Sequence, residues 1–352
     1  MTLTSIGPCR LLQLARYAYA MRTSATNNLV SNQPEVIHRS FDRRFSFPGA
    51  LATSTRATYS SHLRSYLKFC STHGLSPLPA SSTTVCRFAA FLGRSLAPSS
   101  VRQYINIIRI IHLEASLPNP LDACHYHLQA LLSGMKRVKG ASPRFKLPLS
   151  PSHLRTLRAQ LNLALPEDAL FFAVLTACFF GLLRIGNALT SSPASSPSVV
   201  LAGDLRFLPQ GAVLTIRSSK TIQFRDRIHS VVLPHLPNHP LCPVTALRNL
   251  FSVAGTPPPS APLFSCSSSP APTAQAFRQR LSRLLATIGQ SPEDFSTHSL
   301  RRGGATWLLN AGAPLHLIKI LGDWRSDCVL KYLRPDPADS LNLLSNFTNN
   351  SL

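Results

Sequence analysis

The chain has 352 residues, of which 36 are lysine or arginine and 14 are aspartate or glutamate, so its formal net charge is +22. This excess of positive charge favours a polyanionic partner, first of all nucleic acid, although a basic organellar or ribosomal protein would share it. The longest apolar run, residues 169–183, is shorter than the roughly 20 residues of a membrane span, so we expect a buried core helix and no membrane partner.

The eight cysteines are scattered along the chain, and none forms a CxxC pair. This spacing predicts reduced, mostly buried thiols in an intracellular protein rather than a disulfide framework. The one local cluster of ligand types, Cys124-His125-Tyr126-His127, lacks a second pair of ligands at zinc spacing. Neither a metal site nor a cofactor is therefore predicted.

The length predicts two domains plus tails. Residues 1–44 form a basic extension rich in Ser, Thr and Asn, in which Glu35 is the first acidic residue. Within it, residues 11–22 could form a basic amphipathic helix, a pattern that organellar transit peptides share. Because that pattern is so permissive, we favour a disordered extension over a transit peptide.

Residues 45–137 predict a small helical domain, because apolar residues recur at helical spacing after possible capping residues. The four helices are expected to begin at Ser54 or Thr55, at Thr83, at Ser99 and at Leu128. Basic side chains lie on or near the polar faces of the first and third helices, where acidic residues are nearly absent. This favours a DNA-facing surface over a merely solvated one. The predicted DNA contacts are Arg56, Arg64, Lys68, Arg102 and Arg109.

Residues 138–148 are predicted to be a linker, since the surrounding run KRVKGASPRFKLP is basic and contains glycine and two prolines. We expect it to cross a DNA backbone, with contacts from Lys136, Arg137 and Lys139. The alternative is a solvated tether without contacts.

A second domain is predicted over residues 149–347. Ser150 or Ser152 would cap a helix through Leu163, and a long apolar helix would follow over 168–183. Alternating apolar and polar residues then predict two strands, 212–217 and 228–233.

Two basic residues of this domain lie beside predicted elements. Arg184 follows the apolar helix, and Lys220 lies between the two strands as the only lysine between Lys146 and Lys319. Taken alone, Arg184 could be a cation that complements a helix dipole. Lys220 could likewise be an exposed turn lysine that touches a phosphate only electrostatically.

The Pro/Ser-rich residues 255–272 predict an irregular, exposed loop. Residues 273–288 predict a basic amphipathic helix that carries Arg278 and Arg280.

The segment 295–333 holds the residues with the clearest chemistry. His298 and Arg301 are three residues apart and would share a helix face, while Trp324 and Tyr332 follow. A His and an Arg on one face can hold a phosphate, with the Arg bidentate on its oxygens. A tyrosine nearby can attack the phosphorus.

This order, His298-x-x-Arg301, then Trp324, then Tyr332, resembles the C-terminal signature of tyrosine recombinases. The motifs HSLRRGGATW, GDWRSD and KYL look closest to those of recombinases from eukaryotic mobile elements such as DIRS-like retrotransposons and Cryptons. The resemblance implies a mainly α fold with a small antiparallel β-sheet, in which a helical core-binding (SAM-like) domain precedes a mixed α/β catalytic domain. It also implies a nuclear enzyme, although the basic extension leaves an organelle open.

The resemblance implies a role for each site residue. Tyr332 would attack the scissile phosphate and form a 3′-phosphotyrosyl bond, with His298 as base or phosphate donor. Arg184 and Arg301 would hold the non-bridging oxygens, Lys220 would protonate the departing 5′ oxygen, and Trp324 would donate its indole N–H or pack against the site. No metal is needed, because the arginines supply the positive charge. Relatives usually carry an acidic residue three positions beyond the first arginine, where this chain has Asn187.

The resemblance also implies partners. Double-stranded DNA would be the substrate, with Arg278 and Arg280 among its contacts, and the final helix, residues 339–347, would join subunits into a homo-tetramer. Two alternatives stay open. The chain could be a DNA-binding protein of this fold that no longer cuts, or a type IB topoisomerase-like enzyme that relaxes DNA without exchanging strands.

Overall fold

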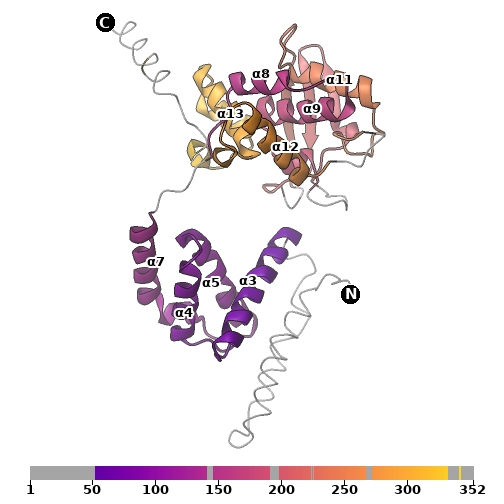
Figure 1. Ribbon diagram of the computed structural model, residues 1–352. Coiled ribbons are helices and arrows are strands. Elements are labelled where there is room, and N and C mark those ends of the chain that lie inside the picture. The colour runs from indigo at the N-terminus through magenta and orange to yellow at the C-terminus, as the bar shows by residue number, and fades with distance from the viewer. Residues whose placement is uncertain are drawn as a thin grey trace, which may run out of the picture. The chain divides into compact units, whose positions relative to one another are not determined.

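The computed structural model describes residues 52–140, 146–190, 198–222, 224, 226–266, 272–331 and 341. The chain divides into two compact units, Met1–Pro143 and Arg144–Leu352 (Figure 1). The division falls inside the predicted linker, and each unit has a hydrophobic core of its own.

The described part of the first unit is entirely helical. It consists of α3 (Thr53–Thr72), α4 (Ser82–Gly93), α5 (Pro98–Glu114), α6 (Pro120–Ala123) and α7 (His125–Lys139). Apolar side chains from α3, α4 and α5 meet in its core, where Tyr66, Phe88, Ile105 and Ile108 are fully buried. The helical spacing of these residues in the sequence therefore identified the buried face of each helix.

The predicted starts of these helices were one to three residues late. Ser81 rather than Thr83 caps α4, since its side chain accepts a hydrogen bond from the Thr84 amide. Three helices of this unit begin without a capping side chain, α3 after Ala52, α5 after Ala97 and α7 after Cys124. Proline at the first position of α5 has the backbone angle that a helix start needs and lacks an amide to satisfy. Short runs of Ser and Thr offer several possible caps, and only tertiary packing selects one.

In the second unit, helices pack against a three-stranded antiparallel sheet. The strands are β1 (Leu205–Leu208), β2 (Gly211–Ile216) and β3 (His229–Pro234), in the order β1-β2-β3. The helices are α8 (Pro151–Ala159), α9 (Pro166–Phe180), α10 (Ile185–Ala188), α11 (Pro243–Ala254), α12 (Ala274–Thr287), α13 (His298–Asn310) and α14 (Leu315–Leu321). The predicted fold class, mainly α with a small antiparallel sheet, is confirmed.

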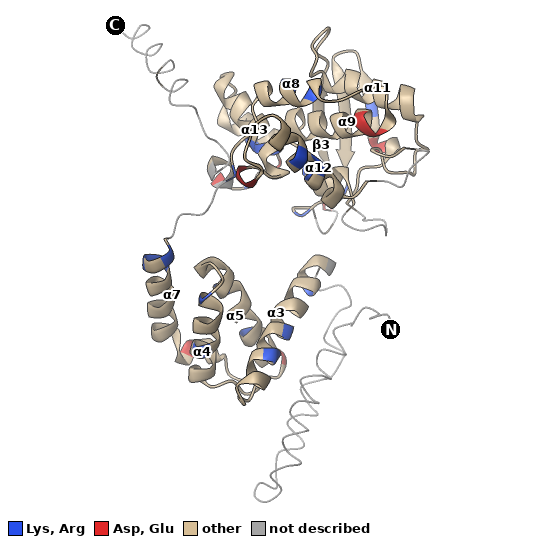
Figure 2. Ribbon diagram, in the orientation of Figure 1, with Lys and Arg blue, Asp and Glu red and all other residues tan. Residues whose placement is uncertain are grey.

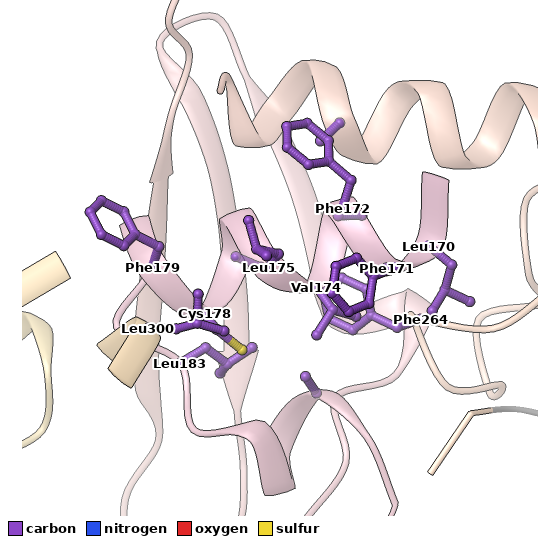
Figure 3. Close-up of a cluster of buried hydrophobic side chains, with 14 of the residues drawn as sticks. Leu170, Phe171, Phe172, Val174, Leu175, Cys178, Phe179, Leu183, Phe264 and Leu300 are labelled. Atoms are coloured by element: carbon purple, nitrogen blue, oxygen red, sulfur yellow. The ribbon is translucent and has the colours of Figure 1, made fainter. Parts of the chain in front are cut away.

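Helix α9 is the centre of this unit. It is buried on all sides from Ala169 to Phe179, and its side chains meet Phe264 and Leu300 from other elements (Figure 3). The prediction of a buried core helix is therefore confirmed, and no helix in the described part of the chain is long and apolar enough to cross a membrane.

Two details of the second unit differ from the sequence-based expectation. The loop after α11 is irregular in its described part, but Leu263 and Phe264 are buried in the core rather than exposed. Helix α9 ends at Phe180 and not at residue 183, because Leu182 takes a left-handed conformation with φ 48°. The chain thus turns before it reaches Arg184.

Glycines let α13 pack directly on the backbone of its neighbours. A Cβ atom at Gly303 would collide with the Leu149 carbonyl oxygen, and one at Gly304 would collide with the Phe179 carbonyl oxygen. This close approach fixes α13 against the end of α9 and so places the first turn of α13 beside the turn that carries Arg184.

Candidate active site

Arg184 is the residue that precedes α10, four residues beyond the end of α9. Its Nη1 donates a hydrogen bond to Thr221 Oγ1 (3.3 Å) and lies 3.8 Å from Asp323 Oδ2. A cation at a helix N-terminus is opposed by the helix dipole. Contacts with Thr221 and Asp323, rather than the end of α9, hold Arg184 in place.

Lys220 lies in the connection from β2 to β3. Reciprocal backbone hydrogen bonds between Ser219 and Ile222 (3.1 and 3.3 Å) close a tight turn around Lys220 and Thr221. The Ser219 hydroxyl accepts a hydrogen bond from the Thr221 amide (3.2 Å). Lys220 is therefore presented from an ordered turn and not from a loose loop.

Asn187 braces the start of that connection. Its side-chain amide donates to the backbone carbonyls of Ser198 (2.7 Å) and Ser218 (3.0 Å), and only 4% of its surface is exposed. Both acceptors are carbonyl oxygens, so this position requires a hydrogen-bond donor. A carboxylate there could make neither bond.

His298 and Arg301 stand in the first turn of α13. Part of the His298 side chain is exposed, yet desolvation of the ring lowers its pKa, and the charges of Arg301, Arg184 and Lys220 lower it further. The charge of Arg302 acts in the same direction, so cations from α13, the turn after α9 and the β2–β3 connection all act on this imidazole. The imidazole is consequently held in its neutral form at physiological pH.

Arg301 is almost completely buried, with 4% of its surface exposed. Its guanidinium donates to the carbonyl oxygens of Leu182 and Gly322 and stacks on the Trp324 ring, whose centroid lies 4.1 Å from Cζ. Trp324 therefore packs against the site by holding Arg301. The neighbouring Arg302 donates instead to the Lys146 carbonyl.

Asp323 is a site residue that the sequence-based reasoning missed. Its carboxylate accepts hydrogen bonds from Arg227 Nη2 (2.6 Å) and from the Thr221 hydroxyl, and 8% of its surface is exposed. Burial alone would raise its pKa, but the hydrogen bonds from Thr221 and Arg227 lower it below the ordinary value. Asp323 is thus a buried carboxylate anion among the cations of the site.

The sequence carried one signal for this role. In the sequence Asp323 follows Gly322, a residue type that commonly ends helices, and in the structure Asp323 has φ 54°. Aspartate tolerates this left-handed conformation better than most residues. Nothing in the sequence, however, relates it to Thr221, which lies 102 residues away.

Tyr332 lies outside the described residues. The 3₁₀ turn Asp327–Lys331 ends immediately before it, and Val329 in that turn is fully buried against the small core that includes Trp324 and Ile318. The described site therefore comprises five of the six predicted catalytic residues together with Asn187, Thr221, Arg227 and Asp323.

Lys and Arg side chains occur along α3 of the first unit (Figure 2). The predicted DNA contacts Arg56, Arg64, Lys68, Arg102, Arg109, Lys136, Arg137 and Lys139 are all exposed. Lys139, however, donates to the carbonyl oxygens of Arg94 and Leu96 (3.1 and 3.3 Å) at the end of α4. It closes that helix end, which is a structural role that the sequence did not indicate.

The two arginines of α12 differ. Arg278 is exposed, whereas Arg280 pairs with Asp168, donates to the Glu167 carbonyl (3.0 Å) and stacks on Phe171. Arg280 therefore holds α12 on the N-terminus of α9, and its contact with DNA stays a prediction. Among the described residues, no three His, Cys, Asp or Glu side chains are arranged to hold a metal ion.

Comparison with known proteins agrees with this fold. Residues 242–337 match the model of the phage integrase family. The chain is 24% identical over 268 residues to an integrase/recombinase xerD homolog of Selenomonas ruminantium, a match that covers 72% of this chain and 73% of the relative.

Two solved structures have similar folds. The Tn1549 transposon integrase in complex with circular intermediate DNA matches with a TM-score of 0.56 and 15% identity, over 88% of this chain and 98% of that one. The XerH site-specific recombinase bound to palindromic difH substrate, a post-cleavage complex, matches with a TM-score of 0.59 and 15% identity, over 96% of this chain and 95% of that one. The family match covers residues 242–337, and the two solved structures share the fold of this chain.

Proposed function

We propose that this chain is a site-specific tyrosine recombinase, which cuts and rejoins duplex DNA through a covalent bond between Tyr332 and the DNA. The observation that carries the proposal is that Arg184 and the turn that carries Lys220 meet at Thr221 and Asp323, while Arg301 donates to the carbonyls of Leu182 and Gly322 beside them. A phosphodiester repels nucleophiles because it is negatively charged, so its cleavage requires a positively charged, preorganised site of this kind.

In this proposal the guanidinium groups of Arg184 and Arg301 bind the non-bridging oxygens of the scissile phosphate, where negative charge develops. Arg301 is oriented for this task by two backbone carbonyls and by Trp324. Because its guanidinium is fixed before DNA binds, little reorganisation accompanies the reaction.

The Tyr332 hydroxyl attacks the phosphorus, and a P–O bond to the tyrosine forms as the bond to the 5′ oxygen breaks. His298 accepts the tyrosine proton, a role that suits its neutral imidazole with a lowered pKa. Lys220 gives a proton to the departing 5′ oxygen. Attack by a 5′ hydroxyl on the phosphotyrosyl bond reverses these steps and rejoins the strand without an external energy source.

The substrate class follows from charge. The net charge is +22, and exposed basic side chains lie on α3, α5 and the end of α7. The two solved relatives described above are recombinases in complexes with DNA. We therefore assign duplex DNA as the substrate, integration or excision of a mobile element in the nucleus as the setting, and a homo-tetramer joined through residues 339–347 as the active assembly.

The alternative of a DNA-binding protein that no longer cuts draws weak support from Asn187, which stands where relatives usually carry an acidic residue. Asn187 is a buried donor to two carbonyls, so a structural role accounts for this residue as well. The formation of a covalent adduct separates the two functions.

The proposal is tested by covalent trapping. Purified protein is incubated with nicked, labelled duplexes taken from the flanks of its own gene, and the products are separated on a denaturing gel. We expect a protein–DNA adduct that Tyr332→Phe abolishes and that the control Tyr126→Phe retains, since Tyr126 is an exposed tyrosine of the first unit. DNA binding without an adduct on any substrate would contradict the proposal.

A further inference from the structure

We propose that Asp323 is a positioning residue that supplies the carboxylate counter-charge of this site and fixes the turn that carries Lys220. Asn187 holds the same turn from its other side. The inference rests on the proposed DNA cleavage. It assigns the arrangement of the site to Asp323 and Asn187, two residues that take no part in bond making.

The position of Asp323 suits a counter-charge. Its two oxygens face different groups, with Oδ1 accepting from Arg227 and Oδ2 accepting from Thr221, and Arg184 Nη1 lies 3.8 Å from Oδ2. Three groups on two segments, the turn before α10 and the β2–β3 connection, are thus tied to one carboxylate. A buried anion in contact with two arginines lowers the repulsion among the cations of the empty site.

The position of Asn187 explains why the carboxylate is at residue 323. The two carbonyl oxygens that Asn187 contacts, those of Ser198 and Ser218, would repel a carboxylate at the same place. The site therefore divides two tasks between two residues. Asn187 donates to the backbone, and Asp323 provides the negative charge.

Lys220 lies between the two anchors. Ser218 is tied to Asn187 through its carbonyl, and Thr221 is tied to Asp323 through its hydroxyl. Thr221 Oγ1 also accepts a hydrogen bond from Arg184 (3.3 Å). The hydrogen bonds from Arg184 to Thr221 and from Thr221 to Asp323 thus couple the orientation of the phosphate-binding arginine to the placement of Lys220.

Asp323 itself does not react in this scheme. Both of its oxygens accept hydrogen bonds, and little of its side chain is accessible to DNA. It acts through Thr221 and Arg184, which makes it a positioning residue rather than a catalytic one.

The test compares Asp323→Asn with the wild type in single-turnover cleavage of a nicked duplex. Asparagine has the same shape and also tolerates the left-handed backbone at this position. Only the charge and one acceptor are lost. The matched control is Asp327→Asn, which removes an exposed carboxylate paired with Lys319 at 3.0 Å.

We expect Asp323→Asn to slow adduct formation by on the order of 10- to 100-fold, the size of effect that misplacement of reacting groups produces. DNA affinity should be unchanged or higher, because the variant has one negative charge fewer. The Asp327→Asn control should react within about twofold of the wild type, since an exposed pair contributes little.

A second substrate separates positioning of Lys220 from general damage. When sulfur replaces the bridging 5′ oxygen, the leaving group is a thiolate, which needs no proton because thiols have a pKa of about 8.5. We expect the Asp323→Asn defect to shrink several-fold on this substrate, as the defect of Lys220→Ala should. A defect of equal size on both substrates, or no defect on either, would overturn the inference.

The two proposals fail in different ways. If the wild type forms no adduct with either substrate, the proposed cleavage is wrong and the role of Asp323 in it falls as well. If the wild type cleaves and Asp323→Asn cleaves equally fast, cleavage stands and only the inference about Asp323 is wrong.

Discussion

At the scale of single residues, hydrogen-bond direction decides what a side chain can do in this site. Asn187 and Asp323 are nearly the same size, yet one donates to carbonyls and the other accepts from an arginine and a hydroxyl. An acceptor in place of the donor at residue 187, or a donor in place of the acceptor at residue 323, would leave a buried polar group without its partner. The free-energy cost would exceed the net contribution of the original hydrogen bond to stability. The two positions are therefore not interchangeable.

Asn187→Asp is predicted to destabilise the second unit by about 1–3 kcal/mol, because the new carboxylate would face two carbonyl oxygens in a buried place. The matched control is Asn162→Asp. Asn162 is exposed and uses its side-chain oxygen to accept from the Ala164 amide, a bond that aspartate also makes.

This comparison is measured by denaturant unfolding followed by tryptophan fluorescence. Both tryptophans of the chain, Trp307 and Trp324, lie in the second unit, so the signal reports that unit alone. Equal midpoints for Asn187→Asp and Asn162→Asp would refute the structural role given to Asn187.

At the scale of elements, the close packing of α13 on α9 positions the chemistry. Gly304 lets the backbones approach until a Cβ atom at this position would collide with the Phe179 carbonyl. His298 and Arg301 are carried on the same helix. A displacement of α13 would therefore move both residues away from Arg184 at once.

Gly304→Ala is predicted to lower the free energy of unfolding of the second unit by about 1–3 kcal/mol, since the added methyl group overpacks a rigid contact. Gly186→Ala is the control, because a Cβ atom at Gly186 meets nothing within 4 Å and lies within α10. Alanine there should be neutral or stabilise by up to about 1 kcal/mol. Thermal unfolding followed by tryptophan fluorescence measures both, and a stable Gly304→Ala variant would show that α13 can shift.

Elements of strong periodicity were predictable from the sequence, and their ends were not. The apolar run that became α9 and the alternation that became β2 and β3 are both intrinsic to short segments. The 12-residue helix α11 was not predicted either. Strand β1 and helices α6 and α10 are only four residues long each and were missed. Their patterns are too short to stand out from their surroundings.

The identity of single site residues could be predicted from the sequence, but the contacts between residues far apart in the chain could not. Spacing within one helix favoured Arg301 over Arg302, and the structure places Arg301, not Arg302, against Trp324. The pairing of Asp323 with Thr221 joins residues 102 positions apart, and no local pattern encodes it. The pairing of Arg280 with Asp168 was missed for the same reason, because the two residues are 112 positions apart.

At the scale of the whole molecule, the histidines make stability depend on pH. Burial is the largest cause of a lowered pKa for a set of five: His62, His112, His153, His229 and His298. His112 illustrates the reason, since its Nε2 accepts from the Ala80 amide (2.9 Å) while its Nδ1 donates to the Ile108 carbonyl (2.7 Å). Protonation of Nε2 would abolish the first of these bonds.

The sign of the effect follows from proton binding. A histidine whose pKa is lower in the folded protein binds fewer protons there than in the unfolded chain, so stability rises with pH across the interval between the two values. We therefore predict that the free energy of unfolding falls as the pH is lowered from 7.5 to about 5, through the ordinary histidine pKa of about 6.5. Asp323, with a lowered pKa, loses its contribution only in more acidic solution, as the pH falls below the ordinary aspartate value.

Urea unfolding at a series of pH values tests this prediction. Burial raises the pKa of Glu114, so this one group makes stability rise on acidification. The five histidines outnumber it. Stability that is constant or increases on acidification between pH 7.5 and 5 would contradict the neutral state of these histidines in the folded protein.

The central claim, that the cations around His298 serve covalent chemistry at Tyr332, is tested most directly by locating the DNA on the protein. The adduct formed on a nicked duplex is digested with nuclease and trypsin, and the peptide that retains a nucleotide is identified by mass spectrometry. We predict the modification on the peptide that begins after Lys331, which contains Tyr332 and no other tyrosine. A nucleotide on Tyr126 or on any other residue, or the absence of a modified peptide, would contradict the account.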